Sequence, residues 1–434
     1  MAPHPYHLPK TTFWHFQSKM QFPHFPSEKV KNHAFLLAKT GEIWYNKRVK
    51  NRAISRGIAI GVGKVMKFVC DGMILSDAAL TVSKACAVKT ITPILECIKL
   101  HAENDGLTLT AYDGEISIEK KILAEVLEDG ELCVNGKTFA DFVGKIASFE
   151  VTVASDEKGI KILYADSESY MQALSAQDFP RLGNRSTEGK EYFEIRETEL
   201  KNLISKTVFC CATDESRPIL KGCLLEAKEG KLYATALDGF RMACGYCDTE
   251  GNTEMKLVCP ARTLVEISRM LDGDEVLKIY ADKNLLSVAV QDTVITSRLY
   301  AGEFVKKENI FPTAFTSVVT VNRVEIMESV ERASVLIRGD KNNLILFDIK
   351  PGKIVISANS DMGKVEETVS ADLDGKELKI AMNGKYLLDA LKALSEENVV
   401  LSFNTSISPF TLENQENRVH QYLVLPVRMG NSGN

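Results

Sequence analysis

The alternation of apolar and polar residues divides the chain after residue 65 into short strands and helices. Residues 97–122 alternate as strands around turns at Asn104-Asp105-Gly106 and Asp113-Gly114. Residues 73–89 and 136–146 instead repeat apolar side chains at helical spacing. Further short alternating segments follow each helix. The pattern predicts an α+β fold, in which two helices cover one face of an antiparallel sheet.

The same pattern recurs after 125 residues. The segment "TPILECIKLHAENDGLTLTAYDGEISI" starts at Thr92, and "RPILKGCLLEAKEGKLYATALDGFRMA" starts at Arg217. The offset also relates Asp113 to Asp238, and it holds from Phe68/Phe193 to Phe179/Phe304, so it spans a whole unit. The period is longer than that of solenoid repeats, so each copy is expected to be a domain.

A third copy is weaker but follows the same design. "VNGKTFADFVGKI", "CPARTLVEISRML" and "MNGKYLLDALKAL" each place a basic residue ahead of an apolar helical stripe, at Lys137, Arg262 and Lys385. Asp361 lies 123 residues beyond Asp238. We therefore expect three α+β domains, with the boundaries 66–190, 191–317 and 318–434.

Residues 1–65 differ in composition from the rest. They hold 11 Lys and Arg against two acids, five of the seven His, and no sustained helical or strand period. We expect a basic, disordered extension. Three interpretations remain open: a start assigned too early, with Met66 the true beginning; a basic tail that touches DNA; or an organelle transit peptide.

Charge is distributed unevenly over the remaining chain. Residues 66–434 carry a net charge of −14, whereas the six predicted helices sum to +4. Net positive helices on an acidic body suggest one surface for a polyanion. A merely solvated helix face gives the same pattern, so charge alone does not decide between a polyanion-binding surface and an ordinary solvated one.

These features together resemble the bacterial DNA sliding clamp, the beta subunit of DNA polymerase III. Besides the repeat, the family-like motifs occur in order: "MKF", "KTITPIL", "DFP", "LDGFRMA", "SRLYAGEF", "NGKYLLDALKAL" and "YLVLPVRM". The resemblance covers residues 66–434 and implies a ring. Two chains of three domains would close head to tail around duplex DNA, with helices lining the hole. Candidate dimer-interface residues are Met171, Val335 and Leu336.

The resemblance also implies two binding surfaces. Sequence-independent DNA contacts are expected at Lys89, Lys137, Arg262 and Lys385, with solvated surface cations as the alternative. A hydrophobic cleft between the second and third domains is expected to bind short apolar peptides of the polymerase, the clamp loader and other replication or repair proteins. Its walls would be Leu220, Leu237, Gly239, Phe240, Arg241, Met242, Pro312, Leu423, Leu425, Pro426, Val427 and Arg428, and Arg241 and Arg428 would donate rim hydrogen bonds.

Two departures from the family pattern affect this cleft. Leu237 and Phe240 stand where the family often has threonine and histidine or tyrosine, which makes the wall more apolar. The chain also continues with "GNSGN" beyond Met429. Both leave partner specificity open.

Cys244 and Cys247 form a CxxC within a strand-like segment. A redox pair is expected at the start of a helix, and zinc requires four ligands, which the sequence does not offer at suitable spacing. We expect reduced structural cysteines, no metal and no cofactor.

No catalytic motif is found. The segment "GIAIGVGKV" lacks the spacing of a phosphate-binding loop. His101 and His420 are the only histidines after residue 65, which leaves few candidates for a general base. We expect a non-catalytic, cytoplasmic protein. The alternatives are a monomeric peptide-binding scaffold of the same fold and, more remotely, a thiol oxidoreductase.

Overall fold

The computed structural model describes residues 66–104, 106–156, 158–180, 190–251, 253–337, 343–415 and 418–428. The basic segment 1–65 and the last residues, 429–434, lie outside this part of the chain. The interpretations of that segment therefore remain predictions. No helix in the described ranges is long and apolar enough to cross a membrane.

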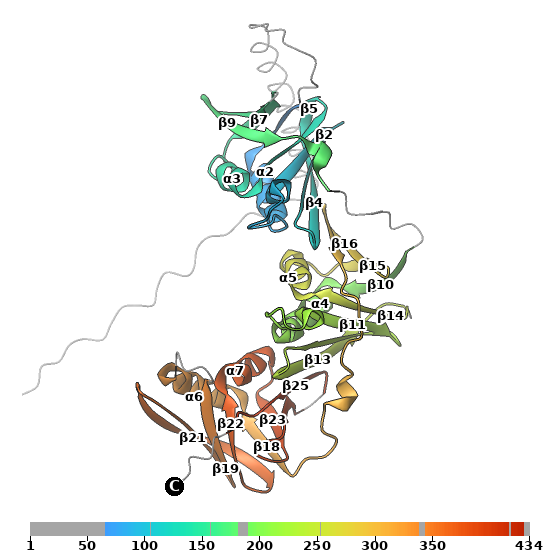
Figure 1. Ribbon diagram of the computed structural model, residues 1–434. Helices are drawn as coiled ribbons and strands as arrows, with labels where there is room; N and C mark the ends of the chain where they lie inside the picture. Colours follow the sequence, from blue (N-terminus) through green and yellow to red (C-terminus); the bar gives the residue numbers. More distant parts are fainter. Residues whose placement is uncertain are drawn as a thin grey trace, which may run out of the picture. The chain divides into compact units, whose positions relative to one another are not determined.

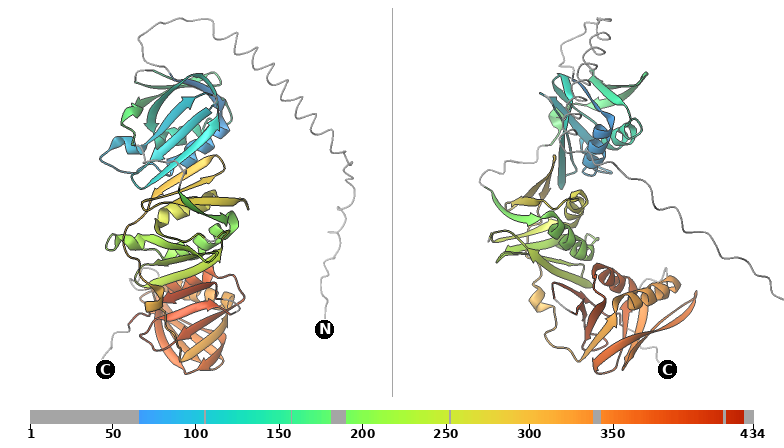
Figure 2. Two further views of the ribbon diagram at one scale, coloured as in Figure 1. Left: turned by 90° about the vertical axis from the view of Figure 1, so that its right-hand side faces the viewer. Right: turned by 180° about the vertical axis from the view of Figure 1, so that it is seen from behind.

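The described residues fold as three successive copies of one design, in which a pair of helices packs on one side of antiparallel strands (Figures 1 and 2). The first copy consists of β1 (Lys67–Asp71), α2 (Gly72–Ser83), η1 (Pro93–Glu96), β2 (Cys97–Glu103), β3 (Gly106–Tyr112), β4 (Ile116–Leu123), β5 (Glu125–Glu128), β6 (Gly130–Asn135), α3 (Gly136–Val143), β7 (Glu150–Ser155), β8 (Gly159–Tyr164), β9 (Ser167–Leu174) and η2 (Ala176–Asp178).

The second copy repeats this order except that it lacks a counterpart of β5 and adds a short 3-10 turn, η3, after its first helix. It consists of β10 (Glu191–Arg196), α4 (Glu197–Thr207), η3 (Val208–Cys210), η4 (Pro218–Lys221), β11 (Gly222–Lys228), β12 (Lys231–Leu237), β13 (Arg241–Asp248), β14 (Met255–Pro260), α5 (Ala261–Met270), β15 (Val276–Ala281), β16 (Leu285–Val290), β17 (Thr293–Arg298) and η5 (Lys307–Asn309).

The third copy follows, and the third strand after its first helix is longer than in the other copies. It consists of β18 (Ser317–Asn322), α6 (Arg323–Leu336), β19 (Leu344–Lys350), β20 (Lys353–Ser360), β21 (Gly363–Gly375), β22 (Leu378–Asn383), α7 (Gly384–Ala393), β23 (Asn398–Phe403), β24 (Phe410–Asn414) and β25 (His420–Val424). The predicted threefold duplication is thus confirmed in the described part of the chain.

Local sequence determines where the helices begin. The Asp71 carboxylate accepts hydrogen bonds from the backbone amides of Met73 and Ile74 at the start of α2. Asn135, Asn322 and Asn383 cap α3, α6 and α7 in the same manner. The apolar stripes then pack inward, so that the core forms between the helices and the sheet.

One helix is shorter than predicted. The pattern predicted a helix over 73–89, but α2 ends at Ser83. The chain then turns, and the amide of Ala87 donates to the carbonyl of Leu95, which holds residues 84–92 as a loop. Apolar side chains in that loop imitate a helical stripe without belonging to one.

The copies are joined by strand pairing. β17 of the second copy pairs antiparallel with β4 of the first, and β25 of the third pairs antiparallel with β13 of the second. The result is one sheet of 13 strands and one of 12 within the described residues. At both junctions the third strand that follows a copy's first helix meets the last strand of the next copy.

Candidate functional site

The Asp238-Gly239 turn joins β12 to β13 and presents an aromatic side chain. The Asp238 Oδ1 atom accepts hydrogen bonds from the amides of Phe240 and Arg241 at 2.9 and 3.0 Å. Gly239 has a φ of 93°, a region that side-chain-bearing residues rarely adopt. Phe240 is 60% exposed, which is unusual for phenylalanine. The turn therefore holds an apolar ring in solvent.

The C-terminal segment lies against this turn. β25 pairs with β13, so that Met242 stands opposite Leu423. Beyond the strand, the amide of Leu425 donates to the carbonyl of Phe240 at 2.9 Å, and that of Val427 donates to Ala381 at 2.8 Å. Two segments almost 200 residues apart in sequence, about residues 237–242 and 423–428, thus lie side by side.

A buried apolar cluster supports the two segments. Leu220, Leu237, Met242 and Leu423 are each buried, and they pack with Leu224, Val258 and Phe304 in one cluster. Ile310 and Phe311 are partly buried against it. The residues expected to form the cleft walls thus fall into two groups, one buried in this cluster and one accessible to solvent. The accessible group comprises Phe240, Pro312, Leu425, Pro426, Val427 and Arg428.

Arg241 differs from the expected rim donor. Its guanidinium donates to Asp238 at 3.0 Å, to Asp389 of α7 at 2.5 Å and to the carbonyl of Phe209 at 3.0 Å. It also lies 4.6 Å from the ring centroid of Tyr386. Burial lowers the pKa of Arg241, but the hydrogen bond to Asp389 and the neighbouring acidic groups raise it overall. Arg241 therefore ties the second copy to the third.

Sequence reasoning did not single out two further accessible residues of the third copy, of which Tyr386 lies beside this site. Tyr386 stacks on Phe240 with ring centroids 6.3 Å apart. Ile407 is 65% exposed just before β24, in a loop where the Asn404 side chain donates to the carbonyl of Ala314. Tyr386 lies three residues after the Asn383 cap, so the motif "NGKYLLDALKAL" contained the signal. Ile407 carried no motif that identified it.

The CxxC residues point to opposite faces of the sheet. Cys244 and Cys247 are three positions apart on β13, and side chains alternate along a strand. Cys244 packs in the cluster below the cleft, whereas Cys247 belongs to the main core. Burial raises the pKa of Cys244 to about 11 and that of Cys247 to about 12. The pair is therefore placed neither to form a disulfide nor to react as thiolates.

The four expected DNA contacts are not equivalent. Lys89 and Lys137 are exposed, and no described residue forms an ion pair with either side chain. Lys385 is also exposed, at the start of α7. Arg262 instead forms an ion pair with Asp113 of the first copy and donates to the carbonyl of Lys84 at 2.7 Å. Arg262 thus bridges the first junction.

Several other helix cations are also engaged within the chain. Lys201 donates to the carbonyl of Leu271, Arg323 to that of Glu396, and Lys392 pairs with Glu331. Arg332 makes two hydrogen bonds to the Glu367 carboxylate, at 2.8 and 2.6 Å. The summed helix charge therefore overstates the positive charge that is free to meet a polyanion.

The expected dimer residues lie on a strand of the first copy and at the end of a helix of the third. Met171 is half-buried on β9, and Val335 is 55% exposed near the end of α6. Leu336 accepts a hydrogen bond at its carbonyl from the Ser360 hydroxyl, which places it beside the start of β21. Met362, at the same turn, is 79% exposed.

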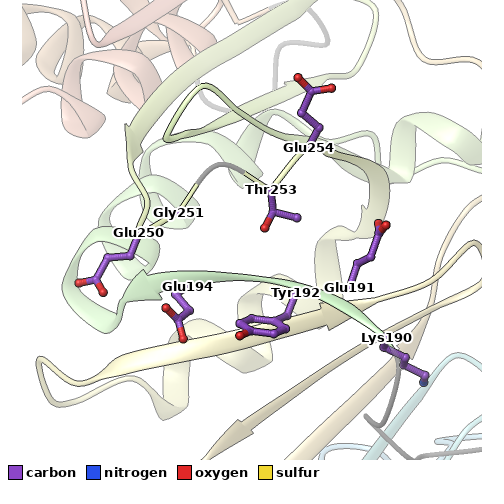
Figure 3. A pocket seen from close by; sticks show the side chains of 8 residues that line it. All are labelled: Lys190, Glu191, Tyr192, Glu194, Glu250, Gly251, Thr253 and Glu254. Atoms are coloured by element: carbon purple, nitrogen blue, oxygen red, sulfur yellow. The ribbon is translucent and has the colours of Figure 1, made fainter.

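A separate acidic hollow lies on the second copy, between β10 and the loop before β14 (Figure 3). Glu191, Glu194, Glu250 and Glu254 contribute to its lining together with Lys190. No group of metal-binding side chains is found among the described residues. The hollow has the wrong charge for a polyanion and coincides with no expected site residue.

Comparison with known proteins places all three copies in one family. Residues 66–183 match the N-terminal domain of the DNA polymerase III beta subunit, residues 194–306 its central domain, and residues 308–428 its C-terminal domain. The three matches follow the order of the three copies.

Individual relatives agree over nearly their whole length. The beta sliding clamp of Halalkalibacterium halodurans is 32% identical over 380 residues, which cover 84% of this chain and 100% of the relative. That of Bacillus subtilis is 30% identical over 378 residues, with the same coverage. The crystal structure of the DNA polymerase sliding clamp from Bacillus subtilis is similar at a TM-score of 0.80, with 30% identity and coverage of 84% and 100%.

Proposed function

Because the chain belongs to the family of DNA polymerase III beta subunits, the bacterial sliding clamps, we propose that two copies of it close head to tail around duplex DNA. One observation carries this proposal. Within the described residues, the three equivalent copies form only two junctions, so one pair of equivalent strand edges has no partner strand there.

The unpaired edges correspond to the strands that pair at the two existing junctions. At the two existing junctions the partners are β4 with β17 and β13 with β25. The corresponding strands that remain are β21 of the third copy and β9 of the first. In the described residues, β9 pairs over Ser167–Gln172 with β8 alone, and β21 pairs over Gly363–Ser370 with β20 alone. Open edges of this length attract another strand.

Polar contacts at the existing junctions suggest a third contact. At the first junction an ion pair joins Asp113, in the turn before β4, to Arg262 of α5, and at the second Arg241, the first residue of β13, pairs with Asp389 of α7. At the third junction the positions that match Asp113 and Arg262 are Asp361 and Lys137. We place these two side chains opposite each other between two copies of the chain.

The helix faces would then surround the DNA. Lys89 and Lys385 are exposed and supply diffuse attraction to phosphates, with Lys137 near the junction and Arg262 bracing the neighbouring domains. Phosphate attraction of this kind is independent of sequence and weakens with salt. Encirclement then keeps the protein on DNA without tight binding, as a processivity factor requires.

The cleft around Phe240 would bind the partner proteins. Its accessible apolar side chains lie over a packed apolar floor, an arrangement that suits a short apolar peptide. We propose that the DNA polymerase catalytic subunit, the clamp loader and other replication proteins insert such peptides there. The chain itself would be non-catalytic and would act in the cytoplasm, where bacterial DNA is replicated.

Sedimentation of the full chain tests ring closure. We expect a dimer for the wild type and a monomer for Leu336→Glu combined with Met171→Glu, since carboxylates at both edges repel across the junction. Leu123→Glu is the control, because Leu123 is 81% exposed on β4 and lies at neither edge. A wild-type monomer, or variants that remain dimeric, would contradict head-to-tail closure. A wild-type monomer that still bound peptide would favour the scaffold alternative.

A further inference from the structure

The loop of residues 84–92, between α2 and β2, displays two aliphatic side chains in water. Val88 is 90% exposed and Ile91 is fully exposed, which makes them the most exposed large apolar side chains among the described residues. Single exposed apolar residues are common, but two on one short loop suggest a binding surface.

The second copy shows that the fold does not need them. In both copies the loop is closed by the same backbone hydrogen bonds, from Ala87 to Leu95 and from Ala212 to Leu220, each at 2.8 Å. Thr213 and Ser216 occupy the positions that correspond to Val88 and Ile91. Since the same loop path forms with polar side chains, the apolar pair is not required for folding.

The surroundings of the loop are basic. Lys84 and Lys89 are exposed within the loop, which contains no acidic residue. The first residue of α3, Gly136, leaves no space for a side chain beside Cys86, so Lys137 follows directly next to the loop. The corresponding loop of the second copy carries Asp214 and Glu215 instead.

The nearest acids do not cancel this charge completely. Asp113 is engaged by Arg262, whose guanidinium also donates to the carbonyl of Lys84. Glu96, half-buried in η1, follows the loop closely in sequence. Lys84 and Lys89 therefore flank the two aliphatic side chains even where Lys137 is engaged at the proposed junction, so the surface attracts an anion that also offers an apolar face.

We propose that Val88 and Ile91 pack against deoxyribose rings of the encircled duplex while Lys84 and Lys89 meet its phosphates. The proposal rests on the proposed clamp function. The face of a deoxyribose is apolar and is the same at every nucleotide, so such a contact is independent of sequence and permits sliding. Unlike the phosphate contacts, it gains nothing from counterion release and is insensitive to salt.

Replacement by the residues of the second copy tests the proposal without loss of fold. In the full chain, Val88→Thr with Ile91→Ser should weaken binding to a 40-base-pair duplex by about fivefold, from the apolar area lost. The slope of log affinity against log NaCl should not change. Lys89→Ala should instead reduce that slope by about one phosphate contact. Leu123→Ser, an equally exposed position on β4, is the control.

Hydroxyl-radical oxidation read by mass spectrometry gives a second measurement. Loading onto circular DNA should protect Val88 and Ile91 from oxidation and leave Leu123 unchanged. Unchanged affinity and unchanged oxidation would overturn the inference while leaving the clamp intact. Normal duplex affinity with failed loading would also overturn it, because the pair would then contact a protein. If the wild type is not retained on circular DNA, the proposed function fails and the inference fails with it.

Discussion

Arg241 shows how one residue can take a role that its motif does not reveal. In "LDGFRMA" it stands next to an exposed turn, where a rim donor is expected. In the fold its side chain is only 10% exposed and forms ion pairs with Asp238 and Asp389, which belong to different copies. A partner 148 residues away cannot be inferred from local sequence.

Removal of this guanidinium should weaken the junction of the second and third copies. We expect Arg241→Ala to lower the free energy of unfolding by about 3 kcal/mol, because it removes the guanidinium that pairs with Asp238 and Asp389 and donates to the Phe209 carbonyl. Chemical denaturation of the full chain measures the change. Arg428→Ala is the control, since Arg428 is exposed and should alter stability very little. Equal effects of the two substitutions would contradict the assigned role.

His420 makes the same junction sensitive to acid. Its imidazole is buried opposite Gly245, and its Nδ1 atom has no hydrogen-bond partner among the described residues. Burial, and then the charge of Lys206, lower the pKa of His420 to about 4, although Glu396 acts in the opposite direction. The folded chain therefore holds a neutral imidazole where the unfolded chain readily binds a proton.

The sign of the pH dependence follows from this lowered pKa. The contribution of the neutral His420 to the free energy of unfolding is fully present above the ordinary histidine pKa of about 6.5. It is lost as the pH falls toward about 4, by up to about 1.4 kcal/mol per pH unit. Denaturation midpoints of the wild type and His420→Gln across this range measure the effect. The variant should show a shallower dependence, since the carboxylates titrate in both proteins. Parallel curves would contradict the account.

Among the elements, the hairpins were predictable and the junctions were not. Asp-Gly turns fix β3–β4 and β12–β13 locally, because the aspartate caps the next amides and the glycine accepts a positive φ. The pairing of β4 with β17 joins strands of different copies, and neither strand carries a signal for the other. The predicted end of α2 was wrong for a related reason. The helix ends at Ser83, and the amide of Ala87 then donates to the carbonyl of Leu95, a contact that the local pattern does not reveal.

The residues of the candidate cleft likewise divide into those that local sequence predicts and those that it does not. Leu237, Met242 and Leu423 were expected as walls because of the family motifs, but only packing reveals that they form the floor. Tyr386 was not singled out because its stacking on Phe240 joins residues of different copies. Residues within the cleft motifs were predictable, whereas a contact between different copies was not.

The two Asp-Gly turns offer a matched comparison. Gly239→Ala and Gly114→Ala should each lower the free energy of unfolding by about 1 kcal/mol, because the φ values of 93° and 105° strain an alanine. Neither added methyl group would clash with a neighbour. Only Gly239→Ala should also weaken binding of an apolar partner peptide, measured by fluorescence anisotropy. Equal peptide affinity in both variants would place the peptide site elsewhere.

At the scale of the whole molecule, threefold duplication explains why the chain needs a second copy. At each junction the third strand after the first helix of one copy pairs with the last strand of the next. Among the described residues, β9 of the first copy and β21 of the third join no other copy. Closure would pair these edges and would also bring the lysines of the helix faces around one opening. The net charge of −14 over residues 66–434 then keeps DNA from adhering to the outer surface.

Retention on circular and on linear DNA tests most directly whether the protein encircles the duplex. The full chain is loaded onto nicked circular plasmid by a clamp loader, and half of the sample is cut once with a restriction enzyme before gel filtration in moderate salt. The account predicts that the protein stays with the circular DNA and leaves the linear DNA by sliding off its ends. Equal retention on both, or equal loss from both, would contradict encirclement.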